Sequence, residues 1–500
     1  MALSPQEITH LSHMLRQGWE YIQQVFQILE DEELSLEELC TLLDLNPDDL
    51  SVNTIWLRWE NIIDHHFVLY WGFGEFARLG CQWVHDFTNL WDSLEDGQCL
   101  HPNIAYLTSL TNIELDFTNP QGIPPTFWQL TQITKLSLNG PLQEVPPELQ
   151  QLTQLTELLL HGCELTSLLD FPWPTLQQLR TLTLSRLKID QLPPAIMDLP
   201  LLSLALHDLS LTILPESIQY CTTLETLDIF NTLITALPNS ITTLSNLRQL
   251  IISNNSLQEF PQQIGQLSNL ESLNLDYNQL PSLPKSIGAL SKLKSLTVTN
   301  NQITHIPAEF GNLDHLEEFS VQHNPIQWLP STLQVLDFDP SQWKEMYLQI
   351  CACRKLKKLS LWNYALTTIP TELTQLTSLT DLELGKNQLT QLSIPLTSFP
   401  NLTQLSLREN PLTSLPNTLF QCRQLQELDL HKLPLSSIPT QMNQLSQLSN
   451  LDLSDTPLTS LPTELIALTK LKTLDITGTR INKAALKAML KWPRGLAIYD

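Results

Sequence analysis

Leucine recurs along this chain in a pattern that restarts every 22 to 24 residues. In the unit 270–292, leucine occupies positions 1, 4, 6 and 11, asparagine occupies position 9 and proline occupies position 15. The pattern restarts at 16 places from Leu110 to Leu471, and only one step, of 40 residues, departs from the period. Apolar residues two apart predict a short strand with one buried face, and the proline ends strand pairing. A fixed period of this length is typical of a solenoid of stacked units.

The unit L-x-x-L-x-L-x-x-N-x-L resembles the leucine-rich repeat family. Its ending, LPxxIxxLxxL, is similar to the 23-residue class found in Ras-group, Scribble-type and bacterial leucine-rich repeat proteins. The resemblance covers roughly residues 107–480. It implies an α/β solenoid of horseshoe shape, with a concave parallel β-sheet inside and short helical turns outside. In each unit, positions 4 and 6 are expected to face the core, and positions 3, 5 and 7 to face outward.

Residues 1–106 lie outside the repeat pattern. They are interpreted as an all-α N-terminal domain. Capping signals and apolar residues at helical spacing indicate several helices, the last of them running from about Glu75 to Leu94. Such a domain would cover the first strand of the solenoid, whose open edge exposes backbone donors and acceptors. The alternative is that this domain carries an enzymatic or ligand-sensing activity, with the repeats selecting the target.

The repeat region and the end of the chain predict two further segments. The solenoid is expected over residues 107–480 with about 16 repeats, and the long step holds a helical insertion near residues 333–355. After the last repeat, Asn482 is expected to begin a helix that places lysines outward. Residues 481–500 are therefore interpreted as a helical C-terminal cap.

Charge and hydropathy exclude several classes of partner. A net charge of −25 argues against nucleic-acid binding and against attraction to an acidic membrane surface. No apolar run approaches the ~18 residues of a membrane-spanning helix, so no membrane insertion is expected. The N-terminus lacks a signal-peptide core, and the cysteines are not clustered as in a disulfide cap. We expect a cytoplasmic protein, with a secreted effector that lacks a classical signal peptide as the alternative.

The cysteines and histidines do not form a catalytic or metal-binding pattern. Cys221, Cys353 and Cys422 stand three places before a repeat start, where other units have leucine, so we expect buried small hydrophobic side chains. The adjacent His65 and His66 would point about 100° apart on a helix, which is poor geometry for one metal ion. No GxxxxGK[ST], GxGxxG or GxSxG motif occurs. We expect no enzymatic activity, no cofactor, no metal and no small-molecule substrate.

The outward strand positions form the predicted binding surface. Most of them carry small polar residues, so the outward Phe230 and Trp362 stand out as interface anchors. We expect Trp362 to be part of a contact site. The alternative is that the inserted helix folds over Trp362 and the site is internal packing. The predicted protein-binding residues are Asp228, Phe230, Asp276, Tyr277, His323, Lys358, Trp362, Arg408 and His431.

An acidic column at position 5 is the second candidate feature of this surface. It is formed by Glu383, Asp429, Asp452 and Asp475. These carboxylates are expected either to attract a basic segment or only to keep a large surface soluble. The chain is interpreted as a non-catalytic scaffold that binds a protein partner through its concave surface, with signalling as one expected context.

Overall fold

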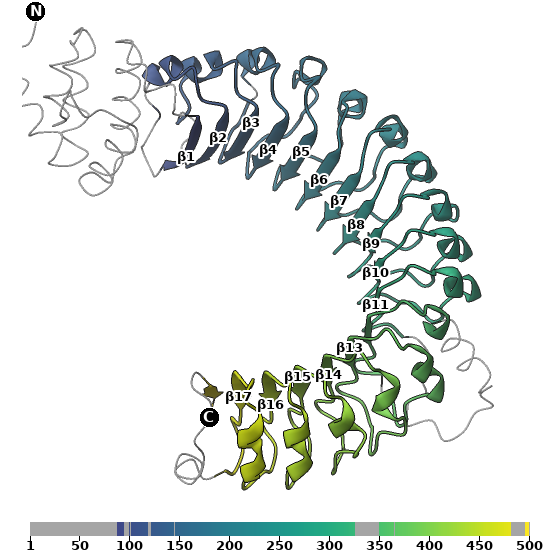
Figure 1. Cartoon of the computed structure of the whole chain (residues 1–500). Helices are drawn as coiled ribbons and strands as arrows, with labels where there is room; N and C mark the ends of the chain where they lie inside the picture. The colour runs from purple at the N-terminus through teal and green to yellow at the C-terminus, as the bar shows by residue number, and fades with distance from the viewer. Residues whose placement is uncertain are drawn as a thin grey trace, which may run out of the picture. The chain divides into compact units, whose positions relative to one another are not determined.

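The computed structural model describes residues 88–94, 100, 102–118, 122–144, 146–325, 350–364, 366–481 and 496–499. The chain divides into two compact units, Met1–Leu224 (unit 1) and Glu225–Asp500 (unit 2). In both units a repeat contributes one short parallel strand, followed in most repeats by one turn or so of 3-10 helix (Figure 1). The helices predicted before residue 88 lie outside the described residues.

Unit 1 contains a parallel sheet in which each described strand pairs with the strand of the next repeat. Ile113 pairs with Leu136, and Leu136 pairs with Leu158, so equivalent positions of successive repeats lie side by side. The strands are β1 (Asn89–Leu94), β2 (Asn112–Phe117), β3 (Lys135–Asn139), β4 (Glu157–His161), β5 (Thr181–Ser185) and β6 (Ser203–His207). The 3-10 helices are η3 (Pro102–Tyr106), η4 (Pro125–Gln129), η5 (Pro147–Gln151), η6 (Trp173–Thr175), η7 (Pro194–Asp198) and η8 (Glu216–Tyr220).

Unit 2 continues the same plan, with its strands on the inner side of a curved array and its 3-10 helices on the outer side (Figure 1). The strands are β7 (Thr226–Phe230), β8 (Gln249–Ser253), β9 (Ser272–Asn274), β10 (Ser295–Thr297), β11 (Glu318–Ser320), β12 (Lys358–Ser360), β13 (Asp381–Glu383), β14 (Gln404–Ser406), β15 (Glu427–Asp429), β16 (Asn450–Asp452), β17 (Thr473–Asp475) and β18 (Ala497–Tyr499). The helices are η9 (Asn239–Thr243), η10 (Ile264–Gln266), η11 (Lys285–Ala289), η12 (Ala308–Asn312), η13 (Thr371–Gln375), η14 (Leu396–Ser398), η15 (Leu419–Gln421), η16 (Thr440–Gln444) and η17 (Thr463–Ala467).

Strand β1 corrects the prediction of a helix that ends at Leu94. Residues 89–94 pair in parallel with β2, and Leu90 is buried opposite Ile113. Apolar residues three or four places apart suit one face of a helix, but they also suit positions 1 and 4 of a repeat. The backbone pairing decides between the two readings, and the array of strands begins inside the segment predicted to be all-helical.

The other two predicted helical segments are described only in part. Residues 350–352 are helical, at the end of the predicted insertion helix, and residues 326–349 lie outside the described residues. The same holds for residues 482–495, which include the predicted cap helix. Beyond them, Ala497–Tyr499 form β18 and pair with β17, so the segment 481–500 contains a strand that the sequence analysis did not predict.

The prediction that positions 4 and 6 of the repeat face the core is confirmed. Leu273 is 1% exposed and Leu275 is fully buried, whereas Ser272, Asn274 and Asp276 on the opposite face are half-buried. Because the repeats are in register, these leucines stack from one repeat to the next in a continuous core. Burial of each such side chain contributes roughly 1.5–3 kcal/mol, so the core is the main source of stability in the stack.

Where a repeat has asparagine at position 9, its side chain ties that repeat to the one before it. The Asn301 side-chain oxygen accepts a hydrogen bond from the Leu280 N–H at 3.0 Å. Its amide nitrogen donates to the carbonyl of Leu275 at 2.8 Å and to that of Val298 at 3.2 Å. Backbone groups that could not reach water are therefore satisfied by a side chain. Buried asparagines occupy the same position at Asn255, Asn278, Asn324, Asn387 and Asn410.

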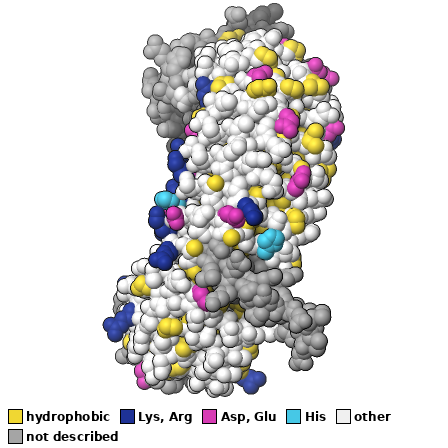
Figure 2. Space-filling model, turned by 90° about the vertical axis from the view of Figure 1, so that its right-hand side faces the viewer, with side chains coloured by type: hydrophobic (Ala, Val, Ile, Leu, Met, Phe, Trp, Pro, Cys, Tyr) yellow, Lys and Arg dark blue, Asp and Glu magenta, His cyan; other side chains and the backbone are white. Residues whose placement is uncertain are grey.

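On the outer side of the repeats, a proline precedes the 3-10 turn. In the repeat of η11, the Ile287 N–H donates to the Pro284 carbonyl at 3.0 Å, and the Leu290 N–H donates to the Ile287 carbonyl at 3.1 Å. These bonds close single 3-10 turns, which are short enough to fit a 23-residue repeat. Figure 2 shows that the helical face of the middle repeats carries mostly uncharged side chains, with acidic ones spread singly.

Candidate functional site

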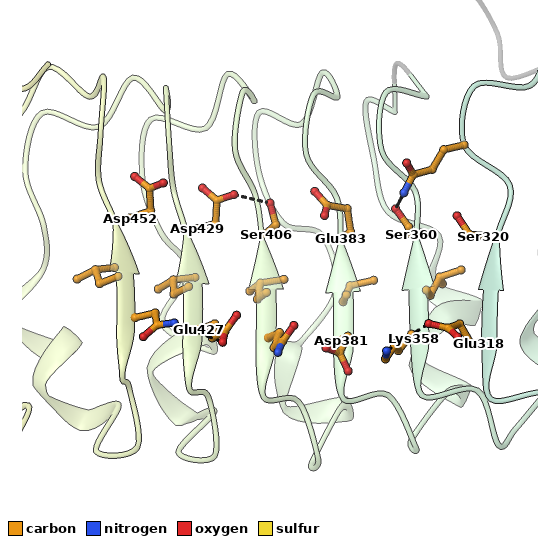
Figure 3. Close-up of a pocket in the computed structure, with 18 of the residues that line it drawn as sticks. Glu318, Ser320, Lys358, Ser360, Asp381, Glu383, Ser406, Glu427, Asp429 and Asp452 are labelled. Carbon is orange, nitrogen blue, oxygen red and sulfur yellow. Dashed lines mark hydrogen bonds and ion pairs between the residues drawn. The ribbon is translucent and has the colours of Figure 1, made fainter. Parts of the chain in front are cut away.

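A groove of about 690 Å³ crosses the outward face of strands β11 to β18 in unit 2 (Figure 3). Its polar lining comes mainly from positions 3 and 5 of each repeat, which lie on the face opposite the leucine core. Two rows of side chains therefore run across the strands. The charged lining residues are seven carboxylates and one lysine: Glu318, Asp381, Glu383, Glu427, Asp429, Asp452, Asp475 and Lys358.

The end of the groove over β11 and β12 is electrically balanced. Lys358 Nζ lies 3.2 Å from Glu318 Oε1, and the two residues are register partners on neighbouring strands. At position 5, this end carries Ser320 and Ser360, and the Gln322 side chain donates a hydrogen bond to Ser360 (Figure 3). A partner segment would meet neutral, hydrogen-bonding side chains here.

The end over β15 to β17 carries an unbalanced column of aspartates. Asp429 pairs in register with Asp452, and Asp452 pairs with Asp475. Neighbouring strands lie ~4.8 Å apart, and like charges directly opposite each other are destabilising. Arg408 Nε lies 3.7 Å from Asp429 Oδ2, but no lysine or arginine in the described part of the chain forms an ion pair with Asp452 or Asp475. Asp452 and Asp475 are therefore the two members of the column without a cationic partner among the described residues.

The backbone holds each of these three carboxylates in a defined orientation. One oxygen of each aspartate accepts the N–H of the residue two places further along the chain. The bonds join His431 N to Asp429 Oδ1 at 3.0 Å, Ser454 N to Asp452 Oδ1 at 2.8 Å, and Thr477 N to Asp475 Oδ1 at 2.9 Å. The spacing of the carboxylates along the column is therefore set by the spacing of the strands.

An indole ring and a guanidinium group are in contact beside the groove, at position 7 of their repeats. The Arg408 guanidinium carbon lies 4.1 Å from the centre of the Trp362 ring, in cation–π geometry. Arg408 Nε is also 3.9 Å from Glu383 and 3.7 Å from Asp429. Gly385 stands in the repeat between them, and a Cβ there would lie 2.4 Å from the indole. Glycine at this outward position lets the ring reach across one repeat.

Four of the predicted binding residues therefore lie in or beside the groove. Lys358 lines it, whereas Trp362, Arg408 and His431 stand at position 7, next to the row of position 5. The His431 ring is half-buried, and its Nδ1 lies 2.7 Å from the Ser454 hydroxyl. The suggestion that the inserted helix covers Trp362 concerns residues outside the described ranges.

The other five predicted binding residues do not line this groove. Asp228 and Asp276 are half-buried at outward positions of the repeats that contain β7 and β9, and Phe230 at the end of β7 is 41% exposed. Tyr277 and His323 are exposed at position 8, where both have a φ of 55°. That left-handed conformation turns the chain away from the strand, so these two side chains belong to the turn.

A second charged row was missed by the sequence analysis. Position 2 of six successive repeats in unit 2 alternates in charge: Glu225, Arg248, Glu271, Lys294, Glu317 and Lys357. Glu271 accepts hydrogen bonds from Lys294 at 2.5 Å and from Arg248 at 2.8 Å, and these two cations lower its pKa. Lys357 lies 2.7 Å from Glu317 and lowers its pKa in the same way. The signal was present in the sequence as alternating signs at one position.

The cysteines in the described part of the chain are buried, which confirms the prediction for Cys221, Cys353 and Cys422. Desolvation raises the pKa of Cys351 and of Cys353 to about 12, and the pKa of Cys163, Cys221 and Cys422 to about 11. Thiols with such pKa values stay protonated, which disfavours nucleophilic or metal-binding roles. In the described ranges, no group of three or more His, Cys, Asp or Glu side chains could hold a metal ion. His65, His66 and their acidic neighbours lie outside these ranges.

None of the helices in the described part of the chain is long and apolar enough to cross a membrane.

The chain matches known repeat families and structures. Residues 239–328 match the family described as a leucine-rich repeat region, and residues 367–490 match the BspA type leucine-rich repeat region. A leucine-rich repeat protein of Leptospira interrogans shares 29% sequence identity, with a TM-score of 0.62 over 83% of this chain and 96% of that chain. The chain belongs to the leucine-rich repeat family. No curated protein sequence matches it.

Two more distant structures show the fold alone. A TLR13–ssRNA13 complex has 22% identity and a TM-score of 0.58, over 79% of this chain and 58% of that chain. A Drosophila Toll–Spätzle complex has 18% identity and a TM-score of 0.52, over 79% and 54%. Leucine-rich repeat proteins generally serve as protein-interaction scaffolds, and their fold is typically non-enzymatic.

Proposed function

We propose that this protein is a non-enzymatic scaffold that binds a positively charged segment of another protein in the acidic groove of unit 2. The observation that carries the proposal is the column Asp429, Asp452 and Asp475, stacked in register in a groove lined by seven carboxylates and one lysine. A bound lysine or arginine would offset the repulsion between Asp452 and Asp475, which form no ion pair with a cation in the described part of the chain.

The dimensions and charge of the groove favour a polypeptide over other ligands. The groove crosses eight strands, which at ~4.8 Å per step spans roughly 34 Å. That length exceeds a small metabolite and suits a peptide segment. A nucleic acid is disfavoured, because its phosphates would face carboxylates in place of the lysines and arginines that release counterions. RNA is the ligand in the TLR13 complex and Spätzle is the partner in the Toll complex, and each is a property of that structure alone.

The edge of the groove supports a protein partner as well. Trp362 is half-buried and stacked on Arg408, so its ring is held in one orientation beside the acidic row. Tryptophan and arginine are the side chains most enriched at interface hot spots. A partner that places a basic side chain on the aspartates would have an aromatic surface next to it.

A charge-neutralising triple variant tests the proposal. Asp429→Asn, Asp452→Asn and Asp475→Asn remove three charges and keep acceptor oxygens for the backbone N–H groups. The matched control is Glu259→Gln, Asp314→Asn and Glu464→Gln, which makes the same change at exposed positions outside the groove. Proteins captured by the full-length wild-type chain are identified, purified and titrated against each variant.

We expect the groove variant to lose affinity by at least about tenfold and the control to stay within about twofold. Equal loss in both variants would show attraction to net charge alone, and an unchanged groove variant would exclude this groove as the site. A cytoplasmic location is part of the same proposal, and imaging of the tagged full-length chain in its native cell tests it.

A further inference from the structure

We infer that the bound segment crosses β15, β16 and β17 as an α-helix that presents one lysine or arginine per turn to Asp429, Asp452 and Asp475. The inference rests on the proposed function, because it specifies the shape of the segment that enters the same groove. It comes from the spacing and rigidity of the aspartates and from the uneven charge along the groove.

The spacing of the carboxylates fits a helix better than an extended chain. The column has one aspartate per strand, at steps of ~4.8 Å, so the outer two are roughly 9.6 Å apart. A helix repeats one face every 5.4 Å, or about 10.8 Å over two turns. An extended peptide repeats one face every ~6.7 Å, or about 13.4 Å over two steps. The mismatch over the column is about 1 Å for the helix and about 4 Å for the extended chain.

The aspartates cannot readily adapt to the wider spacing. Each has one carboxylate oxygen held by a backbone N–H, and Asp429 also accepts the Ser406 hydroxyl at 3.0 Å. The strands of unit 2 lie on the inner side of its curve (Figure 1). Side chains that point away from the leucine core therefore point toward the centre of the curve and converge. Convergence shortens the distance between carboxylates, which adds the same length to both misfits and leaves the helix about 2.6 Å closer to the column than the extended chain.

The uneven charge of the groove gives the helix a direction. Its carboxylates gather over β13 to β17, whereas the end over β11 and β12 is neutralised by the Glu318–Lys358 pair and carries Ser320 and Ser360 (Figure 3). Basic turns would therefore lie over β15 to β17, and uncharged polar turns over β11 and β12. A segment with its lysines at the opposite end would leave the aspartate column without partners.

Two synthetic peptides of identical composition test the helical shape. Both are built from alanine, glutamine and three lysines, and both are titrated calorimetrically against the full chain. In the first peptide the lysines stand at i, i+4 and i+7, on one helical face. In the second they stand at i, i+2 and i+4, on one face of an extended chain, but a helix would place the middle lysine on the side opposite the other two. We expect the first to bind at least about tenfold tighter and to gain helical circular dichroism on binding.

Two variants tie the binding to the column. Asp452→Asn is expected to weaken the first peptide by about fivefold, and the exposed Glu464→Gln is expected to leave it unchanged. A second peptide that binds equally well or better, or a first peptide that binds without gaining helicity, would overturn the helical inference. The proposed function would still stand in that case if the natural partner lost affinity on Asp452→Asn. If neither the peptides nor the natural partner lost affinity on Asp452→Asn, the helical inference and the proposed function would both be excluded.

Discussion

Two rows of charged side chains run across unit 2, and they are built in opposite ways. At position 2 the signs alternate over six repeats, and neighbours such as Glu271 and Lys294 lie 2.5 Å apart. At position 5 of the last three strands of the array before β18, aspartates stack on aspartates, as in the register pair of Asp452 and Asp475. The same scaffold thus pairs its charges on one row and leaves them unbalanced on the other.

The difference separates a stabilising row from a binding row. Exposed ion pairs contribute modestly, up to about 1 kcal/mol, but the alternating row at least avoids repulsion between neighbouring repeats. The aspartate column accepts that repulsion at a place where the sheet face is hollowed into a groove. A row that only kept the surface soluble would have no need to concentrate its charge in a groove. This contrast is the reason to look for a cationic partner at position 5.

The first prediction converts the binding row into the paired row. Asp452→Lys would place a cation between Asp429 and Asp475, so that position 5 alternates as position 2 does. We expect a positively charged peptide to bind at least about thirtyfold more weakly, which is about 2 kcal/mol, while the melting temperature is unchanged or higher. Glu464→Lys makes the same charge change on the outer side and should alter neither affinity nor melting temperature. Wild-type affinity in Asp452→Lys would mean that the column takes no part in binding.

The second prediction converts the paired row into an unbalanced one. Lys294→Glu would create three successive glutamates, at 271, 294 and 317, in place of an alternation. Because two attractive neighbours become repulsive, we expect the midpoint of thermal unfolding to fall by about 2 °C at low salt and the fall to shrink by more than half in 1 M NaCl. Lys292→Glu is the control, since Lys292 hydrogen-bonds Asn269 at 2.6 Å and is outside the row. Equal effects of the two variants would show that position 2 is not a row of coupled charges.

Much of this architecture could be predicted from sequence, because a fixed period carries its own register. Once Leu273 and Leu275 are assigned to the core, the outward face follows from the alternation of a strand. The same logic grouped Glu383, Asp429, Asp452 and Asp475 into one column, in which the three aspartates lie on neighbouring strands and Ser406 stands between Asp429 and Glu383. The burial of Cys221, Cys353 and Cys422 was predicted for the same reason, from their place in the repeat.

Other features could not be read from the period. Strand β1 shares its apolar spacing with a helix, and backbone pairing with β2 distinguishes the two. The contact between Trp362 and Arg408 joins side chains two repeats apart, and it depends on the missing side chain of Gly385 between them. Such contacts follow from the directions of neighbouring side chains, which a list of positions does not contain.

The smallest expected effect is the pH dependence of the paired row. Lys294 and Arg248 lower the pKa of Glu271, and Lys357 lowers that of Glu317, so both groups have folded-state pKa values below the unfolded value of about 4.3. Their attraction is fully present above the unfolded pKa and is lost as the pH falls through the folded pKa. The melting temperature of Lys294→Gln should therefore lie slightly below that of the wild type at pH 7 and approach it by about pH 3. A gap that persisted undiminished at pH 3 would assign the effect of Lys294 to packing of its aliphatic chain, and the contrast between the two rows would then rest on the aspartate column alone.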